Sequence, residues 1–216
     1  MIVTGPNACL VELREVDDVL STWTPGAILT AEEQARAQRF ALPGPARTFI
    51  AGRLLLRSLA ARMAGCRPED VVFSLGPHGK PMVEHPRGVE VNLSHSGGRV
   101  LAAAGSVPLG VDMEAVRPLD WRAIARRFLP ARDHDWLAAF PIEERRRAFF
   151  QLWTWKEAVA KALGVGIALL PDLPPPDSIV EVGGSTFSVS RLDLPEPLVG
   201  HLTMLSLERP RPGTQR

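Results

Sequence analysis

The chain has 216 residues, of which 45% are hydrophobic and 23% are charged, and this ordinary globular composition excludes a disordered protein. Its net charge of +1 provides no general attraction for nucleic acid or an anionic membrane, so a phosphorylated ligand would need a local group of basic side chains. No segment approaches the roughly 20 apolar residues of a membrane helix, and the N-terminus lacks the pattern of a signal peptide. We therefore expect a soluble, cytoplasmic protein that binds neither nucleic acid nor membrane.

The first half of the chain is predicted to contain two helices followed by short strands. A helix over Thr30–Phe40 begins with Thr30 three residues before Glu33, which is the spacing of an N-terminal capping box. A second helix over Ala46–Met63 has apolar residues at helical spacing and ends at Gly65. Short runs rich in β-branched residues then predict strands over Val71–Leu75, Val89–Leu93 and Val100–Ala104. A turn at Gly76–Gly79 is predicted to follow the first of these strands.

The second half is predicted to alternate strands and helices. The expected elements are a strand over Leu109–Glu114, helices over Pro118–Leu129 and Arg145–Leu163, and strands over Thr186–Leu192 and His201–Leu207. The proline-rich segment Pro171–Pro176 is predicted to be a loop, and the tail from Pro210 is predicted to fray. The order of elements predicts an α+β chain in two halves, residues 1–108 and 109–216. No sequence repeat relates the two halves.

The two cysteines, Cys9 and Cys66, have neither metal-ligand nor C-x-x-C spacing. In a cytoplasmic protein such cysteines are ordinarily kept reduced. We therefore interpret both as structural thiols rather than as a disulfide.

The segment Gly110–Glu114 places two acidic side chains on one face of a predicted strand. Side chains at i and i+2 of a strand project from the same face, so Asp112 and Glu114 stand side by side while Val111 and Met113 face the core. Neighbouring carboxylates raise one another's pKa unless a cation lies between them, and Mg²⁺ prefers oxygen ligands of this kind. A solvated strand face with two unrelated acids is the alternative interpretation.

A second group of charges lies in the helix predicted over Arg145–Leu163. Glu157 and Lys161 are four residues apart on one helix face, and an ion pair worth about 0.2–0.5 kcal/mol is the simplest interpretation. Large apolar residues surround them in the sequence, and charges among such groups are costly unless they are paired or used in function. The functional interpretation makes Glu157 a third magnesium ligand and Lys161 a phosphate contact.

Together these two segments resemble the signature of the 4′-phosphopantetheinyl transferase superfamily. The pattern G-V-D-x-E at 110–114 is followed by F-x-x-x-W-x-x-K-E-x-x-x-K at Phe149–Lys161. Smaller pieces occur in the order found in the larger, surfactin-type branch: Arg39-Phe40, 46–48, 54–58, 79–81 and 92–96. The resemblance covers roughly residues 30–165 and implies two similar α/β halves packed as a pseudo-dimer.

The resemblance implies a defined reaction. Such enzymes bind coenzyme A with Mg²⁺ and transfer its 4′-phosphopantetheine arm to a serine hydroxyl of an apo acyl or peptidyl carrier protein, releasing adenosine 3′,5′-bisphosphate. Asp112, Glu114 and Glu157 would then hold Mg²⁺, and Glu157 would also accept the serine proton. Lys161 would contact the pyrophosphate, and Lys156, a hundred degrees around the helix from Glu157, would have a supporting catalytic role.

The matching positions also imply contacts with coenzyme A in the first half of the chain. These contacts are assigned to Arg47, Lys80, Ser94 and His95. The neighbouring Ser94 and His95 do not indicate a hydrolase, because no G-x-S-x-G elbow is present. Arg47 as a solvated arginine at a helix start, and His95 as a capping or core histidine, are the alternative interpretations.

One departure from the family pattern concerns the helix before the R-F pair. Some surfactin-type members place two lysines there that reach the phosphates of coenzyme A, whereas this chain has Glu33 and Arg36. Arg36 can bind an anion, but Glu33 cannot. We therefore expect 3′-phosphate binding to be weaker or to depend on Arg47, with Arg39 as a substitute.

Two other functions compete with the transferase. A non-catalytic module of the same fold would bind coenzyme A or a carrier without turnover, and a magnesium-dependent hydrolase would cleave phosphoanhydrides with water. The arginines of Trp121–Arg132 could complement an acidic carrier, although a solvated basic helix face explains them equally well. The sequence does not identify the carrier, and a chain with two halves is expected to be a monomer.

Overall fold

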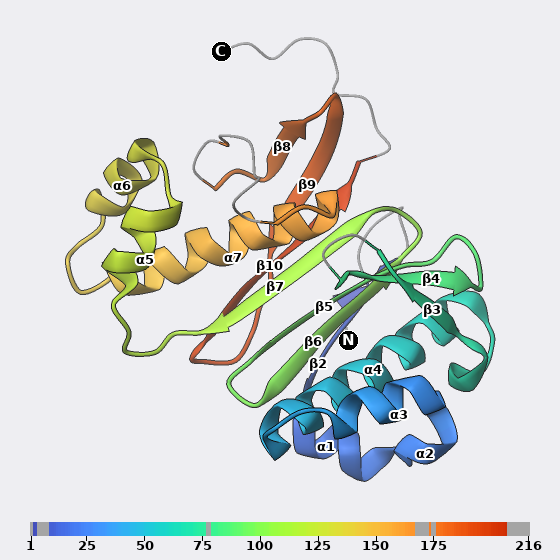
Figure 1. Ribbon diagram of the computed structural model, residues 1–216. Coiled ribbons are helices and arrows are strands. Elements are labelled where there is room, and N and C mark those ends of the chain that lie inside the picture. Colours follow the sequence, from blue (N-terminus) through green and yellow to red (C-terminus); the bar gives the residue numbers. More distant parts are fainter. Residues whose placement is uncertain (1, 4–8, 77–78, 167–172, 174–175, 207–216) are drawn as a thin grey trace.

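A computed structural model describes residues 2–3, 9–76, 79–166, 173 and 176–206. Its centre consists of two four-stranded antiparallel sheets, ordered β1-β2-β6-β5 and β7-β10-β9-β8 (Figure 1). A separate hairpin pairs β3 with β4. The strands are β1 Ile2–Val3, β2 Cys9–Glu15, β3 Val72–Leu75, β4 Pro81–His85, β5 Glu90–Ser96, β6 Arg99–Gly105, β7 Leu109–Ala115, β8 Ile179–Val182, β9 Ser185–Arg191 and β10 Leu198–Leu205.

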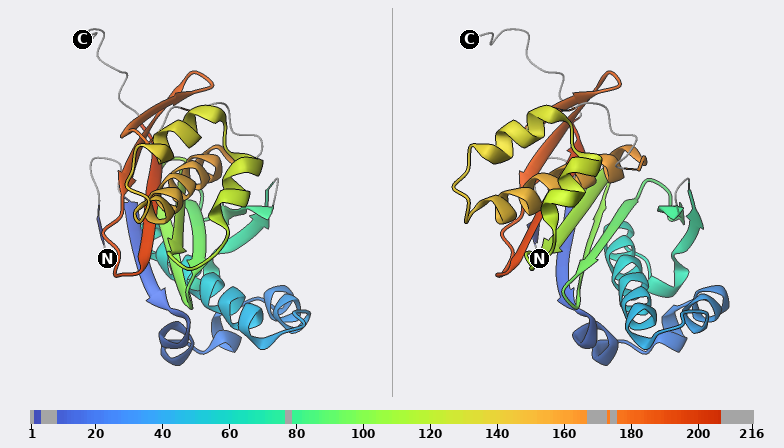
Figure 2. Two further views of the ribbon diagram at one scale, coloured as in Figure 1. Left: turned by 90° about the vertical axis from the view of Figure 1, so that its left-hand side faces the viewer. Right: turned by 60° about the vertical axis from the view of Figure 1, so that its left-hand side comes forward.

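Helices cover both sheets on their outer sides. They are α1 Val16–Thr22, α2 Pro25–Ile28, α3 Ala31–Gln38, α4 Pro43–Ala64, α5 Trp121–Phe128, α6 Ala131–Ala138 and α7 Arg145–Leu163, with a short 3₁₀ turn at Pro68–Asp70. The long helix α4 packs on β6 and β5, and the long helix α7 packs on β7 and β10. The two sheets lie between these helices (Figure 2). The predicted α+β fold with two similar halves is confirmed.

Side-chain alternation along β6 and β7 explains this layered arrangement. In β6, Ala102 and Ala104 join the core under α4, whereas Leu101 and Ala103 point into a second core between the two sheets. A strand buried on both faces needs an unbroken apolar run, and β6 provides one. Valine and methionine side chains of β7 fill the core between the sheets from the other side, which leaves its remaining face for α7.

Most of the predicted elements are present, with shifts of a few residues at their ends. The predicted capping box is confirmed, because Glu33 N donates to Thr30 Oγ1 over 3.2 Å and Thr30 N donates to Glu33 Oε2 over 3.1 Å. Gly65 ends α4 with φ 70°, a left-handed conformation that favours glycine. The predicted loop at 171–176 falls mostly, and the tail from 210 entirely, outside the described residues. Within the described ranges, no helix is both long and apolar enough to cross a membrane.

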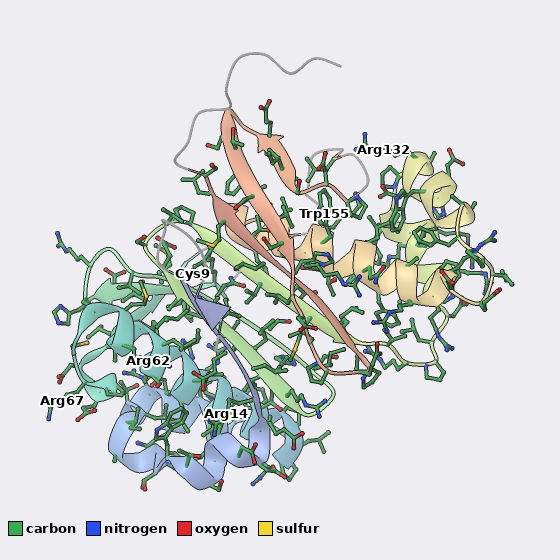
Figure 3. All side chains as sticks on the ribbon, turned by 180° about the vertical axis from the view of Figure 1, so that it is seen from behind. Cys9, Arg14, Arg62, Arg67, Arg132 and Trp155 are labelled. Atoms are coloured by element: carbon green, nitrogen blue, oxygen red, sulfur yellow. The ribbon has the colours of Figure 1, made fainter. Side chains whose placement is uncertain are left out.

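Both cysteines are free thiols, as predicted. Cys9 lies fully buried in the core between the sheets, and burial raises the pKa of its thiol to about 11 (Figure 3). Cys66 is partly exposed. Because the thiolate is the reactive form, we expect iodoacetamide to modify Cys66 of the native protein at least about 100-fold faster than Cys9. Mass spectrometry should show one adduct in the folded protein and two in urea; equal labelling of both thiols would contradict this expectation.

The two sheets meet along β5 and β7 through side chains rather than through a backbone ladder. Asn92, Ser94 and Ser96 project from one face of β5. Their side-chain oxygens accept hydrogen bonds from the backbone N–H groups of Val111, Met113 and Ala115, over 3.0, 3.2 and 3.0 Å respectively. The polar side chains of β5 therefore satisfy the open edge of β7.

Loss of the Asn92 side chain is expected to destabilise this junction. Asn92→Ala leaves the buried N–H of Val111 without an acceptor, which should lower the free energy of unfolding by about 1–3 kcal/mol. Urea unfolding measures the change, and Ser106→Ala in an exposed turn serves as the control. Equal stability of Asn92→Ala and Ser106→Ala would show that the junction does not depend on this hydrogen bond.

Candidate active site

Strand β7 presents its two acidic residues as the sequence predicts. Val111 and Met113 are fully buried in the core between the sheets. Asp112 and Glu114 point from the opposite face, where α7 crosses the strand. Backbone alternation therefore separates the packing residues from the acidic residues.

Asp112 is held by one residue from each half of the protein. Its Oδ1 accepts hydrogen bonds from Ser94 Oγ of β5 and from Lys161 Nζ of α7, each over 2.7 Å. Burial raises the pKa of Asp112, and the charge of Lys161 opposes that rise. Lys161 also donates to the backbone carbonyls of Val111 over 3.2 Å and Leu93 over 3.5 Å, so its ammonium group connects α7, β7 and β5.

Glu114 has a similar setting two residues further along the strand. Its Oε2 accepts from Ser96 Oγ and from an Arg117 guanidinium nitrogen, each over 2.8 Å. Ser94 and Ser96 thus make the same pair of hydrogen bonds, since each accepts from the backbone of β7 and donates to an acidic side chain of that strand. These two serines orient both carboxylates.

Glu157 is the third carboxylate of the cluster. It lies half-buried one helical turn before Lys161, and burial, followed by the charge of Asp112, raises its pKa. Among the described residues none donates a hydrogen bond to Glu157. A half-buried carboxylate without a donor is suited to accept a proton or to bind a cation.

The donor set of this cluster suits Mg²⁺, although the three side chains are not gathered around one point. In the part of the chain that the structure describes, no group of three or more His, Cys, Asp or Glu residues is positioned to hold a metal ion. Asp112 is paired with Lys161, and Glu114 is paired with Arg117. Three neighbouring carboxylates with raised pKa at two of them are nevertheless the chemistry that a hard divalent cation stabilises. The magnesium ligands therefore stay a prediction.

Helix α7 can approach β7 closely because residue 110 is a glycine. A Cβ atom at Gly110 would overlap the backbone carbonyl oxygen of Ala158 and the backbone nitrogen of Ala162. Gly110, Asp112 and Glu114 share one strand face, so the glycine admits the helix beside the acidic pair. This contact places Glu157 and Lys161 next to the carboxylates of β7.

A cavity of about 330 Å³ opens beside this cluster. Its cationic lining comes from both halves, from Arg36, Arg53, Lys80 and Lys161, and the imidazole of His95 also lines it. Among the described residues that line it, none is acidic. Lys80 Nζ donates to the backbone carbonyl of Lys161 over 2.9 Å, and burial lowers the pKa of Lys80. The cavity is therefore suited to a polyanionic ligand.

The structure brings most of the predicted residues together at this cavity. Eight of the predicted side chains belong to the cavity lining or to the adjoining acidic cluster: Arg36, Lys80, Ser94, His95, Asp112, Glu114, Glu157 and Lys161. Arg47 lies elsewhere. It is exposed, forms an ion pair of 2.7 Å with Asp17 of α1, and does not line the cavity.

Lys156 also points away from the cluster. It is 4% exposed and forms an ion pair of 2.9 Å with Asp133 of α6, which is fully buried. This contact joins α6 to α7 on the side of the helix away from Lys161. The placement gives Lys156 a structural contact and does not support the catalytic role predicted for it.

Sequence reasoning assigned no role to several residues that the site uses. Asn92, Ser96, Arg53 and Arg117 all contact or line the site. The polar residues at i, i+2 and i+4 of β5 could have been predicted to act together, because that spacing places them on one strand face. The role of Arg53 could not have been predicted, since one arginine among the apolar residues of α4 resembles an ordinary helix-surface residue.

The fold and the site define a class: a two-half α+β protein whose acidic cluster and cation-lined cavity lie where the halves join. Comparison with known families agrees. A family model described as the 4′-phosphopantetheinyl transferase superfamily matches residues 108–200, and one described as 4′-phosphopantetheinyl transferase, N-terminal, matches residues 20–107. The chain belongs to the 4′-phosphopantetheinyl transferase superfamily.

Individual relatives carry the same name. The chain is 39% identical to 4′-phosphopantetheinyl transferase HetI of Nostoc sp. over 68% of its own length and 64% of HetI. It is 37% identical to psf-1 of Bacillus pumilus over 63% of its length and 58% of psf-1. With Sfp of Bacillus subtilis it shares 31% identity over 66% of its length and 63% of Sfp. The matched part therefore spans less than two thirds of each of these relatives. The similarity to Sfp supports the surfactin-type branch.

Proposed function

We propose that the protein transfers the 4′-phosphopantetheine arm of coenzyme A to a serine hydroxyl of an apo acyl or peptidyl carrier protein. The observation that carries the proposal is the acidic cluster of Asp112, Glu114 and Glu157, which adjoins Lys161 and opens toward a cavity lined by cations. An anionic substrate with a pyrophosphate fits such a cavity, and the relatives carry the name of this activity.

The residues of the cluster have separate roles in this reaction. The serine oxygen attacks the pyrophosphate phosphorus that carries pantetheine, the phosphorus–oxygen bond to the adenosine side breaks, and adenosine 3′,5′-bisphosphate leaves. Glu157 accepts the serine proton on its half-buried carboxylate, which receives no hydrogen bond from the described residues. Lys80 and Lys161 bind the pyrophosphate oxygens through their ammonium groups.

Asp112, Glu114 and Glu157 are the residues that would hold Mg²⁺. Mg²⁺ bound there would supply positive charge to neutralise the pyrophosphate and the leaving group. Ser94 and Ser96 each donate a hydrogen bond to one of the two carboxylates of β7 and so restrict the orientation of both. Lys161 balances the charge of Asp112 when the cation is absent.

The decisive experiment measures carrier mass. The protein is incubated with coenzyme A, Mg²⁺ and each of several apo carriers from fatty-acid, polyketide and nonribosomal-peptide pathways, and each carrier is then weighed by mass spectrometry. One added phosphopantetheine on a carrier supports the proposal. No mass gain on any of them would overturn it, and coenzyme A binding without transfer would favour the non-catalytic module. Cleavage of the pyrophosphate without a carrier would favour the hydrolase.

Removal of a ligand charge should change the magnesium requirement. Asp112→Asn keeps the size of the side chain, and we expect it to raise the Mg²⁺ concentration for half-maximal transfer by about 10-fold or more, as losing a charged contact of about 1.5–3 kcal/mol implies. Magnesium titrations of the initial rate measure the change. Asp135→Asn on α6, outside the cluster, is the matched control. An unchanged titration for Asp112→Asn would remove this residue from the metal site.

Further proposals accompany the activity. We propose that residues 1–108 provide contacts with coenzyme A, that residues 109–216 carry the metal ligands and the catalytic helix, and that the protein acts as a cytoplasmic monomer without nucleic acid or membrane. Sedimentation velocity in the presence of coenzyme A tests the monomer. The close joining of the two sheets within one chain supports it.

A further inference from the structure

Two polar side chains lie buried where α7 packs on β10. Thr154 of α7 is fully buried, and His201 of β10 is 7% exposed. Thr154 Oγ1 and His201 Nδ1 lie 2.9 Å apart, which is hydrogen-bond distance. Helix α7 lies across β10 and β7 (Figure 1). The pair therefore joins the helix that carries Glu157 to the sheet beneath it.

The surroundings of the pair determine which atom donates. Thr154 Oγ1 donates its hydrogen to the backbone carbonyl oxygen of Gln151 over 3.1 Å. A hydroxyl group has one hydrogen, so the contact with His201 is a hydrogen bond only if Nδ1 of the imidazole donates. Burial lowers the pKa of His201 to about 4, and the positive charge of Arg191 adds to this effect. The ring is therefore neutral near neutral pH and carries its single N–H hydrogen on Nδ1.

His201 stands beside the acidic cluster without being part of the cavity lining. In the pairing of β10 with β7, His201 lies directly opposite Asp112. Residues opposite each other in an antiparallel pair share one face of the sheet, so both side chains point toward α7. Thr154 lies three residues before Glu157, which places the bonded threonine about one helical turn from the proposed base.

The other contacts of α7 near the cluster do not hold the helix in one place throughout the proposed reaction. Apolar packing is not directional, so the buried side chains Leu152 and Val159 resist separation better than sliding. Lys161 Nζ bonds to Asp112 over 2.7 Å, but the reaction uses both groups, and binding of the pyrophosphate and the cation changes that bond. The bond between Thr154 and His201 is directional and involves no group that the reaction uses.

We propose that Thr154 and His201 are positioning residues, whose hydrogen bond sets where α7 lies on β10 and so holds Glu157 beside the carboxylates of β7. The inference rests on the proposed function, because it concerns how the base of that reaction is placed. Neither residue contacts the substrate. A displacement of about 1 Å in a reacting group costs about 100-fold in rate, so one buried hydrogen bond can have a large effect.

Conservative and non-conservative variants of both residues test the inference. Thr154→Val and His201→Leu remove the hydrogen bond but keep apolar bulk. Thr154→Ser and His201→Asn keep it, because the asparagine amide nitrogen can take the place of Nδ1. In single-turnover transfer at saturating coenzyme A and Mg²⁺, we expect the first two variants to be about 10- to 100-fold slower, and the other two to stay within about 3-fold of the native rate.

The double variant of Thr154→Val and His201→Leu separates positioning from stability. It leaves neither partner unpaired, and replacing both partners of a buried hydrogen bond by apolar groups is nearly neutral for stability. Thermal unfolding should therefore show a near-native midpoint while transfer stays slow. A native transfer rate in the double variant would show that packing alone is sufficient, which overturns the inference. The double variant also takes the place of Thr154→Val if the unpaired N–H of His201 prevents that protein from folding.

Thr203→Val is the matched control, because it makes the same chemical change in the same buried layer. Thr203 is fully buried two residues from His201, on the same strand face, and its hydroxyl has no hydrogen-bond partner among the described residues. The change removes no hydrogen bond, so the transfer rate should be near the native value. A loss as large as that in Thr154→Val would mean that any change beneath α7 slows transfer, and the inference would be wrong.

Nuclear magnetic resonance of protein labelled with ¹⁵N-histidine tests the bond without any transfer reaction. The His201 signals, identified by their absence in His201→Asn, should show the hydrogen on Nδ1, and a hydrogen on Nε2 would overturn the inference. A native protein that modifies no carrier overturns the proposed function and this inference with it. Native transfer that is retained by Thr154→Val, His201→Leu and the double variant overturns the inference alone.

Discussion

Replacement of Glu157 by glutamine is expected to lower the rate of phosphopantetheine transfer by about 10²- to 10⁴-fold, the usual contribution of a general base. Glutamine keeps the shape of the side chain but cannot accept the serine proton. Because Glu157 has no hydrogen bond from the described residues that the change would break, the fold should be unaffected. Single-turnover transfer to an apo carrier measures the rate. Equilibrium dialysis measures the affinity for coenzyme A, which should stay within about 10-fold of the native value, a smaller loss than removal of one charged contact would cause.

Glu143→Gln provides the control for this variant. Glu143 is exposed just before α7 and lies outside the cluster, so the same chemical change there should leave the transfer rate near the native value. A near-native rate for Glu157→Gln would show that another group accepts the proton. A folded Glu157→Gln protein that no longer binds coenzyme A would instead assign Glu157 to substrate binding.

Gly110→Ala is expected to disrupt the packing of α7 on β7. Its Cβ would overlap backbone atoms of α7 at Ala158 and Ala162, and backbone cannot move aside as a flexible side chain can. We expect the free energy of unfolding to fall by about 1–3 kcal/mol or more. Since α7 carries Glu157 and Lys161, displacement of the helix should also reduce transfer by about 10²-fold, as misplaced reacting groups do.

The control for Gly110→Ala is the same substitution where space is available. Gly26 lies in α2, and a Cβ there would meet nothing within 4 Å. Gly26→Ala should be neutral or slightly stabilising, because alanine loses less backbone entropy than glycine in a helix. Denaturant unfolding measures the stability of each variant, and a transfer assay measures its rate, so the two variants can be compared in both properties. Equal stability would mean that the contact between α7 and β7 is looser than the structure shows.

The elements that the sequence predicts well are those whose signals are local. Helix α7 has both ends where its pattern placed them, because its long apolar stripe stops at Gly164, which adopts φ 72°. The strand β2 was not predicted, since its partner β6 lies far along the chain and no neighbouring turn marks it. Helices α1 and α6 were missed because they are short and lack a side-chain cap. The edge strand β8 has only four residues.

The candidate site shows the same division between local and distant information. The spacing of Asp112 and Glu114 on a strand, and of Glu157 and Lys161 on a helix, predicted which side chains share a face. Nothing local predicts that Lys161 meets Asp112, because the crossing of α7 over β7 sets that contact. The pairing of Arg47 with Asp17 was not predictable for the same reason, because it depends on the packing of α1.

The junction between β5 and β7 has a consequence for the synthesis of the protein on the ribosome. Strand β5 leaves the ribosome before β7, so the edge that β7 will cover is open while the second half is still being made. Open strand edges recruit other chains and begin aggregation. Beside this edge, β5 presents asparagine and serine side chains that water can solvate before β7 is made. We therefore expect the groups that later orient the carboxylates to favour solubility of the unfinished chain as well.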